Sequence, residues 1–467
     1  MCATTIMLAM GITSCKKLLE PTMDQLLVND SAVRSIKDVD NVLNSAYDGM
    51  QSGNVLGGNA TCYGELMTDD SEVLEYRLSQ FGTAEMYNGT TSIQIGALRD
   101  MWRDHYATIN RANIVLYALD SSSQVIADPN YARSAPRQRG EALAIRAICH
   151  FNLTRLWCLP YDVNNPGNNT AEQGGVVLRL NSTRTEQNLS KPRATLEETY
   201  NQVIADFKQA ETLLSALPTP ANRDRLSADA VRALLARVLF YKGEYAEAAT
   251  YAKKVLSTGK YELSDSLQLL YRQSGAAMEL GPTNRPETIF QLSNTALDNS
   301  NSLPGFYSTA GGGYVVLMKS DFKASFSSND RRRALTNAFG VCLKYINPVS
   351  ISGAPIVSPN VHIIRLAELH LILAESNLIS GGDAQEALNS YNAVYLRAMR
   401  GGTAETSTTG LLDKVREQRR KELFFEGDRY GNMRRLGLPL KKGNDYRPFL
   451  FKIPQEEMAA NSLIKQN

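Results

Sequence analysis

Residues 228–257 carry the feature that most limits how this chain can fold, a pair of short amphipathic segments that meet at Gly243. Apolar side chains recur three and four positions apart in both segments, at Val231, Leu234, Leu235 and Val238 and again at Tyr245, Ala248, Ala252 and Val255. This spacing predicts two helices, each with one apolar face. Two such helices cannot bury these faces alone, so neighbouring helices must cover them.

The spacing is typical of a tetratricopeptide-type (TPR) helix pair. A second pair of this kind is predicted within residues 361–400, where apolar positions align on both sides of a turn at Gly381 and Gly382. A helix that follows a capping box at Thr195–Glu198 has the same periodicity and precedes the first pair. We therefore expect a TPR-like scaffold over residues 195–258 and 361–400. A generic helical hairpin without repeat ancestry is the alternative.

Further helices are predicted at residues 38–51 and 93–120, and from Pro136 to Trp157. Trp102 and Trp157 fall at helical spacing and are expected in the core. Two stretches, about 52–91 and 260–360, show no sustained period, and short strands are expected at 174–180, 287–292 and 314–318. Long irregular stretches in a compact domain are usually functional or disordered. The predicted fold is mostly α, with long irregular loop insertions and a few short strands.

The N-terminus is similar to a lipoprotein export signal. Residues 2–14 form an apolar run too short to cross a bilayer, and Ile12-Thr13-Ser14-Cys15 looks like a lipobox. We predict a signal peptide at residues 1–14, lipidation of Cys15, a tether with a lead-in segment at residues 15–37, and a single domain at residues 38–467. No Lys or Arg precedes the apolar run, so a chance match is the alternative.

Charge and cysteine content argue against several function classes. A net charge of +2 provides no global field for nucleic acid, so no nucleic-acid partner is expected. His362 and His370 form no metal-binding motif, and the glycine-rich stretches lack the residues of a phosphate loop. No metal and no cofactor are therefore expected. Too few cysteines for a disulfide framework remain after Cys15, at Cys62, Cys149, Cys158 and Cys342.

Residues 415–437, VREQRRKELFFEGDRYGNMRRLG, would alone predict a charged surface helix with the ion pairs Glu417–Lys421 and Glu426–Arg429. They are preceded by IRLAELHLILAES and followed by FKIPQEEMAANSLIKQN. Earlier in the chain stand NSAYDGM, GEALAIRAICHFNLTRLW and the pattern W-x-x-x-Y-x-x-I-x-x-x-N at Trp102, Tyr106, Ile109 and Asn113. With these segments the chain resembles the SusD/RagB family. It departs from the family pattern at Gly431-Asn432, where an aromatic residue and Asp are usual, and at Asn461-Ser462, where Asn-Pro is common.

The resemblance implies a mostly helical SusD-like fold with four TPR-like pairs and a loop-rich face. It implies an outer-membrane lipoprotein, anchored by lipid and facing the cell exterior, that binds oligosaccharides for a SusC-like TonB-dependent β-barrel transporter. A peptide ligand, as in RagB-like members, is the alternative, and a TPR scaffold lipoprotein without a small ligand is a third possibility. An enzyme is not expected, because a glycoside hydrolase needs a carboxylate pair and the sequence shows no paired motif.

Sugar capture requires apolar ring faces together with planar polar groups. Both insertions offer them, and we expect the two insertions to converge into one binding surface. The candidates in the first insertion are Asp69, Asp70, Tyr76, Arg77, Phe81 and Tyr87. The candidates in the second insertion are Asn299, Asn301, Phe306, Tyr307 and Tyr314. For each of them, an ordinary loop residue is the alternative.

Overall fold

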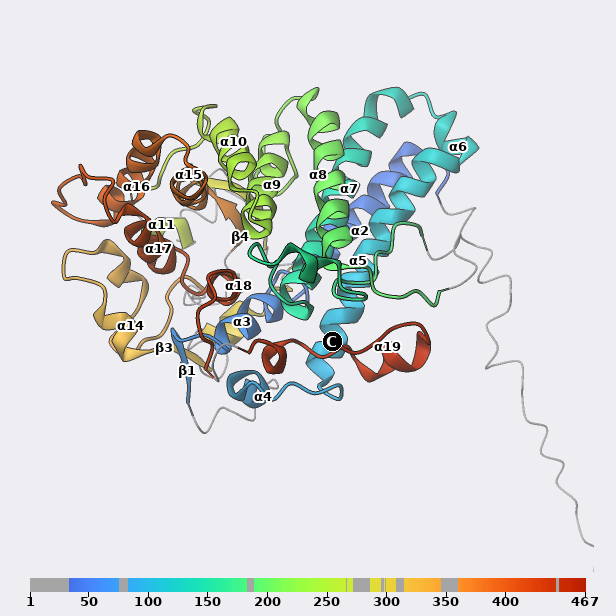
Figure 1. Ribbon diagram of the computed structural model, residues 1–467. Helices are drawn as coiled ribbons and strands as arrows, with labels where there is room; N and C mark the ends of the chain where they lie inside the picture. Colours follow the sequence, from blue (N-terminus) through green and yellow to red (C-terminus); the bar gives the residue numbers. More distant parts are fainter. Residues whose placement is uncertain are drawn as a thin grey trace, which may run out of the picture.

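The computed structural model describes residues 33–74, 83–182, 189–265, 267–271, 286–294, 298, 300–307, 315–345, 360–441 and 445–467. Its frame is a row of long helices that pack side by side, each against the next, from α2 at one end to α16 and α17 at the other (Figure 1). These helices are α2 (Ile36–Gln51), α5 (Gly96–Ser121), α7 (Tyr131–Trp157), α8 (Leu196–Ser215), α9 (Ala228–Lys242), α10 (Tyr245–Leu256), α15 (Leu366–Ser380), α16 (Ala384–Ala398) and α17 (Leu411–Glu422).

Local sequence signals explain where these helices begin and end. At Thr195 the side chain accepts a bond from the backbone N–H of Glu198, whose carboxylate accepts one from the Thr195 N–H, so the predicted capping box is confirmed. Gly243 ends α9 with φ of +86°, a left-handed conformation that favours glycine. Gly381 ends α15 in the same way, with φ of +72°. Both predicted helix pairs are therefore confirmed.

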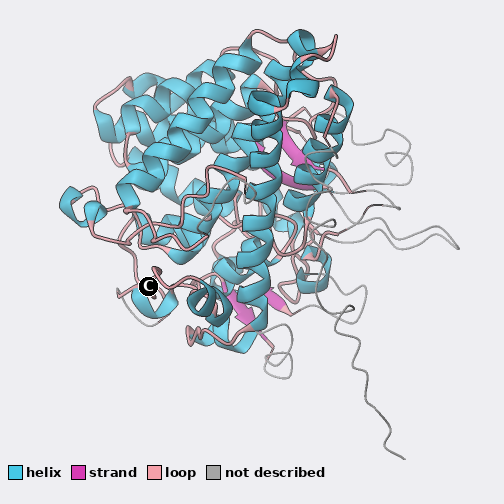
Figure 2. Ribbon diagram, turned by 90° about the vertical axis from the view of Figure 1, so that its right-hand side faces the viewer, coloured by secondary structure: helices cyan, strands magenta, loops and turns pink. Residues whose placement is uncertain are grey.

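Shorter elements surround the frame. The short helices are α3 (Asn59–Leu66), α4 (Thr83–Asn88), α6 (Ser123–Ile126), α11 (Leu267–Tyr271), α13 (Leu303–Tyr307), α14 (Ser320–Ala324), α18 (Arg429–Arg435) and α19 (Gln455–Ala460), with single 3-10 turns η3 (Pro166–Thr170), η4 (Arg331–Leu335) and η5 (Arg447–Phe449). The strands β1 (Ser71–Val73) and β3 (Val316–Met318) form one antiparallel pair, and β2 (Thr288–Leu292) and β4 (Val361–Arg365) form another. Figure 2 shows the two pairs as separate small sheets among the helices.

The structure corrects two predicted helix starts and one predicted strand. Residues 361–365 form strand β4 instead of a helical turn, because this segment, which contains the β-branched residues Val361, Ile363 and Ile364, pairs with β2. Helix α7 begins at Tyr131, so Pro136 lies inside it, where its missing N–H removes one hydrogen bond near the helix start. Residues 174–180 form no strand; backbone bonds from Gly175 to Ala194 and from Ala194 to Val176 tie this loop to the start of α8.

The core consists of one large cluster that extends from α2 to α15 and a separate small cluster between α15, α16 and α17. Trp102 and Trp157 are 4% and 1% exposed and their rings lie 5.4 Å apart, which confirms the prediction that both are core residues. The ring of Phe451, near the C-terminus, lies 5.2 Å from that of Trp157, so the last segment of the chain packs back on α7. Along the described ranges, no helix combines the length and the apolar character needed to cross a bilayer.

Candidate functional site

The two insertions meet in a small antiparallel sheet. Strand β1 belongs to the first insertion and β3 to the second, and they pair with Ser71 opposite Met318 and Val73 opposite Val316. The first insertion also contacts the second ahead of β1, where the Ser302 N–H donates to the carbonyl of Gly57 at 2.9 Å. A Cβ atom on Gly58 would lie 1.7 Å from the Ser302 hydroxyl, so a larger residue there would require the Ser302 side chain to move. Within the described residues the two insertions are therefore in direct contact, as expected, while their role as a binding surface stays a prediction.

Beside this sheet lies a hollow of about 320 Å³ that both insertions line. Glu72 comes from the first insertion, and the remaining walls come from the second. The lining combines apolar rings with charged groups of both signs, at Glu72, Lys323, Phe326, Arg333 and Phe339. Such a surface can stack on an apolar ligand face while its charged groups accept and donate hydrogen bonds.

Phe339 dominates the rim of this hollow. Its side chain is 76% exposed, whereas every other aromatic side chain in the described ranges is buried or half-buried. Leaving a ring in water forgoes about 2 kcal/mol of burial free energy. The exposed ring and the charged groups beside it are therefore both accessible to a ligand.

The turn that carries Phe339 is tightly held. The Asn337 side-chain oxygen accepts from the N–H groups of Phe339 and Val341, at 2.9 and 3.0 Å. Gly340 follows with φ of +83°, and its carbonyl accepts from the Met318 N–H of β3 at 2.8 Å. Lys323 of α14 donates to the carbonyl of Ala338 at 2.5 Å. The ring is thus presented by an ordered turn, which lowers the entropic cost of binding.

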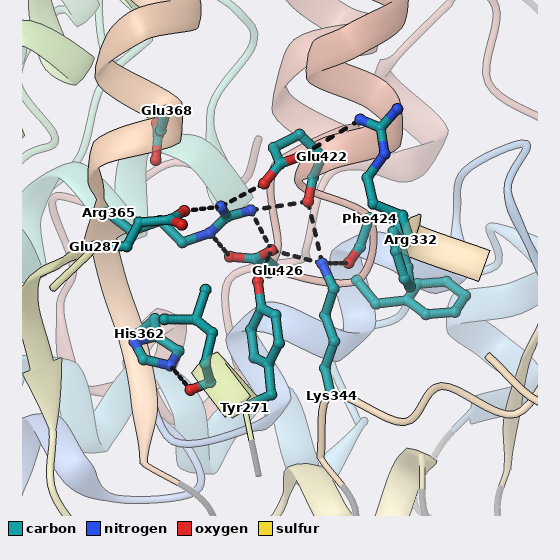
Figure 3. A network of polar contacts seen from close by, with 12 residues as sticks. Tyr271, Glu287, Arg332, Lys344, His362, Arg365, Glu368, Glu422, Phe424 and Glu426 are labelled. Atoms are coloured by element: carbon teal, nitrogen blue, oxygen red, sulfur yellow. Dashed lines mark hydrogen bonds and ion pairs between the residues drawn. The ribbon is translucent and has the colours of Figure 1, made fainter. Parts of the chain in front are cut away.

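A buried ion-pair network fixes both ends of this turn to the helical frame (Figure 3). Before the turn, Arg332 donates to both carboxylate oxygens of Asp330 and lies 3.4 Å from Glu422. After the turn, the Lys344 ammonium lies 2.6 Å from Glu426 and 2.9 Å from the Phe424 carbonyl. At its centre Arg365 of β4 contacts Glu287, Glu422 and Glu426. Buried charges persist only when paired in this way.

This network corrects the prediction for residues 415–437. They form two helices, α17 and α18, separated by a corner in which Phe424 and Phe425 are buried. Phe425 has φ of +58°, an unfavourable conformation for a residue with a side chain. Glu426 pairs with Arg365 and Lys344 in place of Arg429, because the corner turns it inward. The surface pair Glu417–Lys421 is confirmed, at 3.0 Å.

Two predicted acidic residues lie next to β1 as partners of arginines. Asp69, with a side chain 43% exposed, receives two bonds from Arg429, at 2.9 and 2.7 Å. Asp70 is buried and is bound by Arg420 and Arg429. Asp70 thus anchors the first insertion to α17 and α18, while Asp69 retains access to solvent.

The remaining described candidates differ in accessibility. Tyr87 is half-buried, and the Lys441 ammonium lies 3.2 Å from its ring centre, so one ring face is already covered. Burial and the charge of Lys319 lower the pKa of Lys441 to about 7. The Asn301 side-chain oxygen accepts from the Leu303 N–H at the start of α13.

Phe306 and Tyr307 do not present their rings to the solvent, which corrects the prediction for this part of the second insertion. They are 3% and 0% exposed. Tyr307 stacks on Phe425 at 5.1 Å, and Phe306 packs on Tyr63 at 5.8 Å. Their apolar rings complete the core beneath the sheet instead of lining its surface.

Several predicted residues lie outside the described residues, namely Tyr76, Arg77, Phe81, Asn299, Tyr314 and the lipidation candidate Cys15. The residues that line the hollow, above all Phe339, were not among the predicted site residues. A signal for it exists in the local sequence, because Asn337-Ala-Phe-Gly340 has the residue types of a tight turn with an apolar residue at its tip.

Comparison with known proteins identifies the architecture. Residues 20–240 match a SusD-like family model described as starch-binding and associating with the outer membrane, and residues 314–467 match the model of the SusD family. The SusD-like protein P38 of Formosa agariphila is 23% identical over 261 residues, which make up 56% of this chain and 46% of that protein. The match therefore spans about half the length of this curated relative.

Solved structures share the whole fold. A SusD superfamily protein from Bacteroides thetaiotaomicron superposes with a TM-score of 0.79 at 23% identity, covering 93% of this chain and 99% of the other. A SusD-like carbohydrate binding protein from Bacteroides vulgatus gives 0.74 at 18% identity, covering 92% and 98%. With both family models matched and the fold shared almost from end to end, this chain belongs to the SusD/RagB family.

Proposed function

We propose that this protein captures oligosaccharides at the hollow between its two insertions. The observation that carries the proposal is Phe339, an exposed ring on an ordered turn with Glu72, Lys323 and Arg333 around the same hollow. A pyranose ring has one apolar C–H face and a rim of hydroxyl groups, which match an aromatic ring and flanking polar groups respectively. The description of the matched family as starch-binding supports the same ligand class.

The role is binding without a catalytic step. One of the two family models that the chain matches is described as starch-binding. The charged groups of the hollow would also suit a peptide. Binding of oligosaccharides is therefore compared with binding of peptides. Isothermal titration calorimetry of the purified protein against panels of soluble oligosaccharides and of short peptides should detect binding to an oligosaccharide. Binding to peptides alone would favour the RagB-like alternative.

The same proposal places the protein at the outer membrane through a lipid on Cys15, facing outward and delivering its ligand to a SusC-like TonB-dependent transporter. Support comes from the lipobox-like sequence before Cys15 and from the described association of the family with the outer membrane. Stable anchoring requires more than one acyl chain, which a lipoprotein cysteine carries. Cys15→Ala should release the protein from the membrane fraction, whereas unchanged acylation and membrane association would contradict the anchor.

Co-purification from native membranes should recover a large β-barrel.

A further inference from the structure

We propose that this protein carries a second carbohydrate subsite, a pocket of about 270 Å³ between α5, residues 177–181 and α19 that takes one sugar ring. The inference rests on the proposed oligosaccharide binding but concerns a different place in the molecule. The pocket shares no lining residue with the hollow beside Phe339. In Figure 1, α19 and the sheet of β1 and β3 lie toward opposite sides of the lower half of the molecule.

The walls of this pocket, which we call the α19 pocket, combine the two surface types that a sugar needs. Val177, Leu189 and Ala460 supply apolar contacts together with the ring of Tyr106. Polar groups reach the same space from Asn110, Arg179, Asn181 and Glu457. Its size suits a single ring, because pockets for larger ligands start at about 300 Å³.

The carboxylate of Glu457 is held in place from behind. The Trp102 indole N–H donates to one of its oxygens at 3.3 Å, and the Asn461 amide donates to the other at 3.0 Å. Asn461 is itself fixed by two bonds to the backbone of Lys191, at 3.0 and 2.9 Å. Both donors to Glu457 are neutral, and a carboxylate can accept about four hydrogen bonds. The Glu457 carboxylate therefore keeps capacity to accept further hydrogen bonds from ligand hydroxyl groups.

The opposite wall is equally well ordered. The Tyr106 hydroxyl donates to the carbonyl of Val177 at 3.0 Å, which fixes the ring. The Asn113 amide donates to the carbonyls of Arg179 and Asn181, each at 3.0 Å, and accepts from Arg146 at 3.0 Å. Residues 177–181 are thus bound to α5 and α7 although they form no regular element.

These contacts give a role to the pattern W-x-x-x-Y-x-x-I-x-x-x-N. Its Trp102 orients Glu457, its Tyr106 lines the pocket, and its Asn113 holds residues 177–181. Three of the four pattern residues thus build one pocket. Preorganised polar groups beside an aromatic ring are what a binding site requires. A second subsite would hold a chain end or a branch and would raise overall affinity by effective concentration.

The test uses methyl glycosides of glucose, galactose and mannose as probes, with saturation-transfer NMR titrations of the purified protein. Ala460→Trp fills the α19 pocket from an exposed position, and Ala459→Trp on the same short helix is the matched control. Glycoside binding should weaken at least tenfold in Ala460→Trp and stay unchanged in Ala459→Trp. Glu457→Gln keeps the side-chain shape but removes the charge, and should weaken glycoside binding severalfold without lowering the melting temperature.

Phe339→Ala separates this inference from the proposed function. If the α19 pocket is a subsite, Phe339→Ala retains glycoside binding, whereas Ala460→Trp weakens it at least tenfold. Glycoside binding that is indifferent to Ala460→Trp but lost in Phe339→Ala overturns the second subsite and leaves the proposed function standing. Binding of glycylglycine in place of glycosides would overturn the sugar assignment. Absence of any binding to glycosides and oligosaccharides would overturn both.

Discussion

The ammonium group of Lys344 lies 2.6 Å from a carboxylate oxygen of Glu426, and the Lys344 side chain is fully buried. The pair joins the end of the Phe339 turn to the corner between α17 and α18. Burial alone would raise the pKa of the Glu426 carboxyl, but the charges of Arg365 and Lys344 lower it to about 2. Glu426 is therefore ionised at neutral pH and depends on its cationic partners.

Lys344→Met should destabilise the protein by about 2–4 kcal/mol, because it leaves part of a buried negative charge without its partner. Arg365 still contacts Glu426 and limits the loss. Lys208→Met is the matched control, since the solvent-exposed pair Lys208–Glu247, 2.7 Å apart, should contribute less than about 1 kcal/mol. Urea unfolding at pH 7 measures both values. Equal costs for the two variants would show that the buried network does not fix the turn.

The pKa of the Glu65 carboxyl in α3 is shifted in the opposite direction, upward. Burial, together with the charges of Asp70 and Asp428, raises the pKa of this carboxyl to about 8 from an ordinary value of 4.5. Because the folded protein holds this proton more tightly than the unfolded chain does, the carboxyl lowers stability progressively as pH rises from about 4.5 to about 8.

Glu65→Gln removes this titration while keeping an oxygen for the Gly427 N–H that Glu65 binds at 2.9 Å. Relative to the wild type, the variant should therefore gain stability as pH rises, by about 3–4 kcal/mol between pH 5 and pH 8. Urea unfolding of both proteins at the two pH values provides the comparison. A stability difference that does not change with pH would mean that Glu65 is already ionised in the folded protein.

Gly340→Ala should disrupt the Phe339 turn while leaving the Phe339 side chain itself in the sequence. A Cβ atom there would lie 2.6 Å from the carbonyl oxygen of Met318, and φ is +83°. We expect a loss of about 2 kcal/mol or more in stability and weaker oligosaccharide binding. Gly437→Ala is the control, because Gly437 also has positive φ, +68°, but its Cβ would meet nothing within 4 Å. Similar effects in the two variants, measured by thermal unfolding and calorimetry, would rule out the backbone contact as the cause.

The sequence predicted the helical frame well because its signals are local. The capping box at Thr195 and the helix-ending Gly243 depend only on residues a few positions away. The prediction failed where an element forms by pairing between residues that are far apart in the sequence. Residues 361–365 continue the apolar pattern of α15, yet they pair with β2, far away in sequence. No local pattern contains that information.

The candidate site was harder to predict for a physical reason. Aromatic residues in an irregular segment serve the core and the surface alike, and sequence does not distinguish them. Phe306 and Tyr307 prove to be core residues beneath the sheet, whereas Phe339 lies exposed on a turn that the pairing of β1 with β3 brings next to Glu72. The same difficulty applies to charged residues. Glu426 was predicted to form a surface ion pair, but it contacts the buried Arg365.

Phe339→Ala provides the most direct test of the central claim that the two insertions form one oligosaccharide-binding hollow. The side chain is 76% exposed, so its removal should leave the melting temperature unchanged. By calorimetry, the dissociation constant for the tightest oligosaccharide should rise about tenfold, since a stacked ring contributes roughly 1.5 kcal/mol. Leu396→Ala, an exposed apolar residue in α16, should not change affinity. Wild-type affinity in Phe339→Ala would contradict the account.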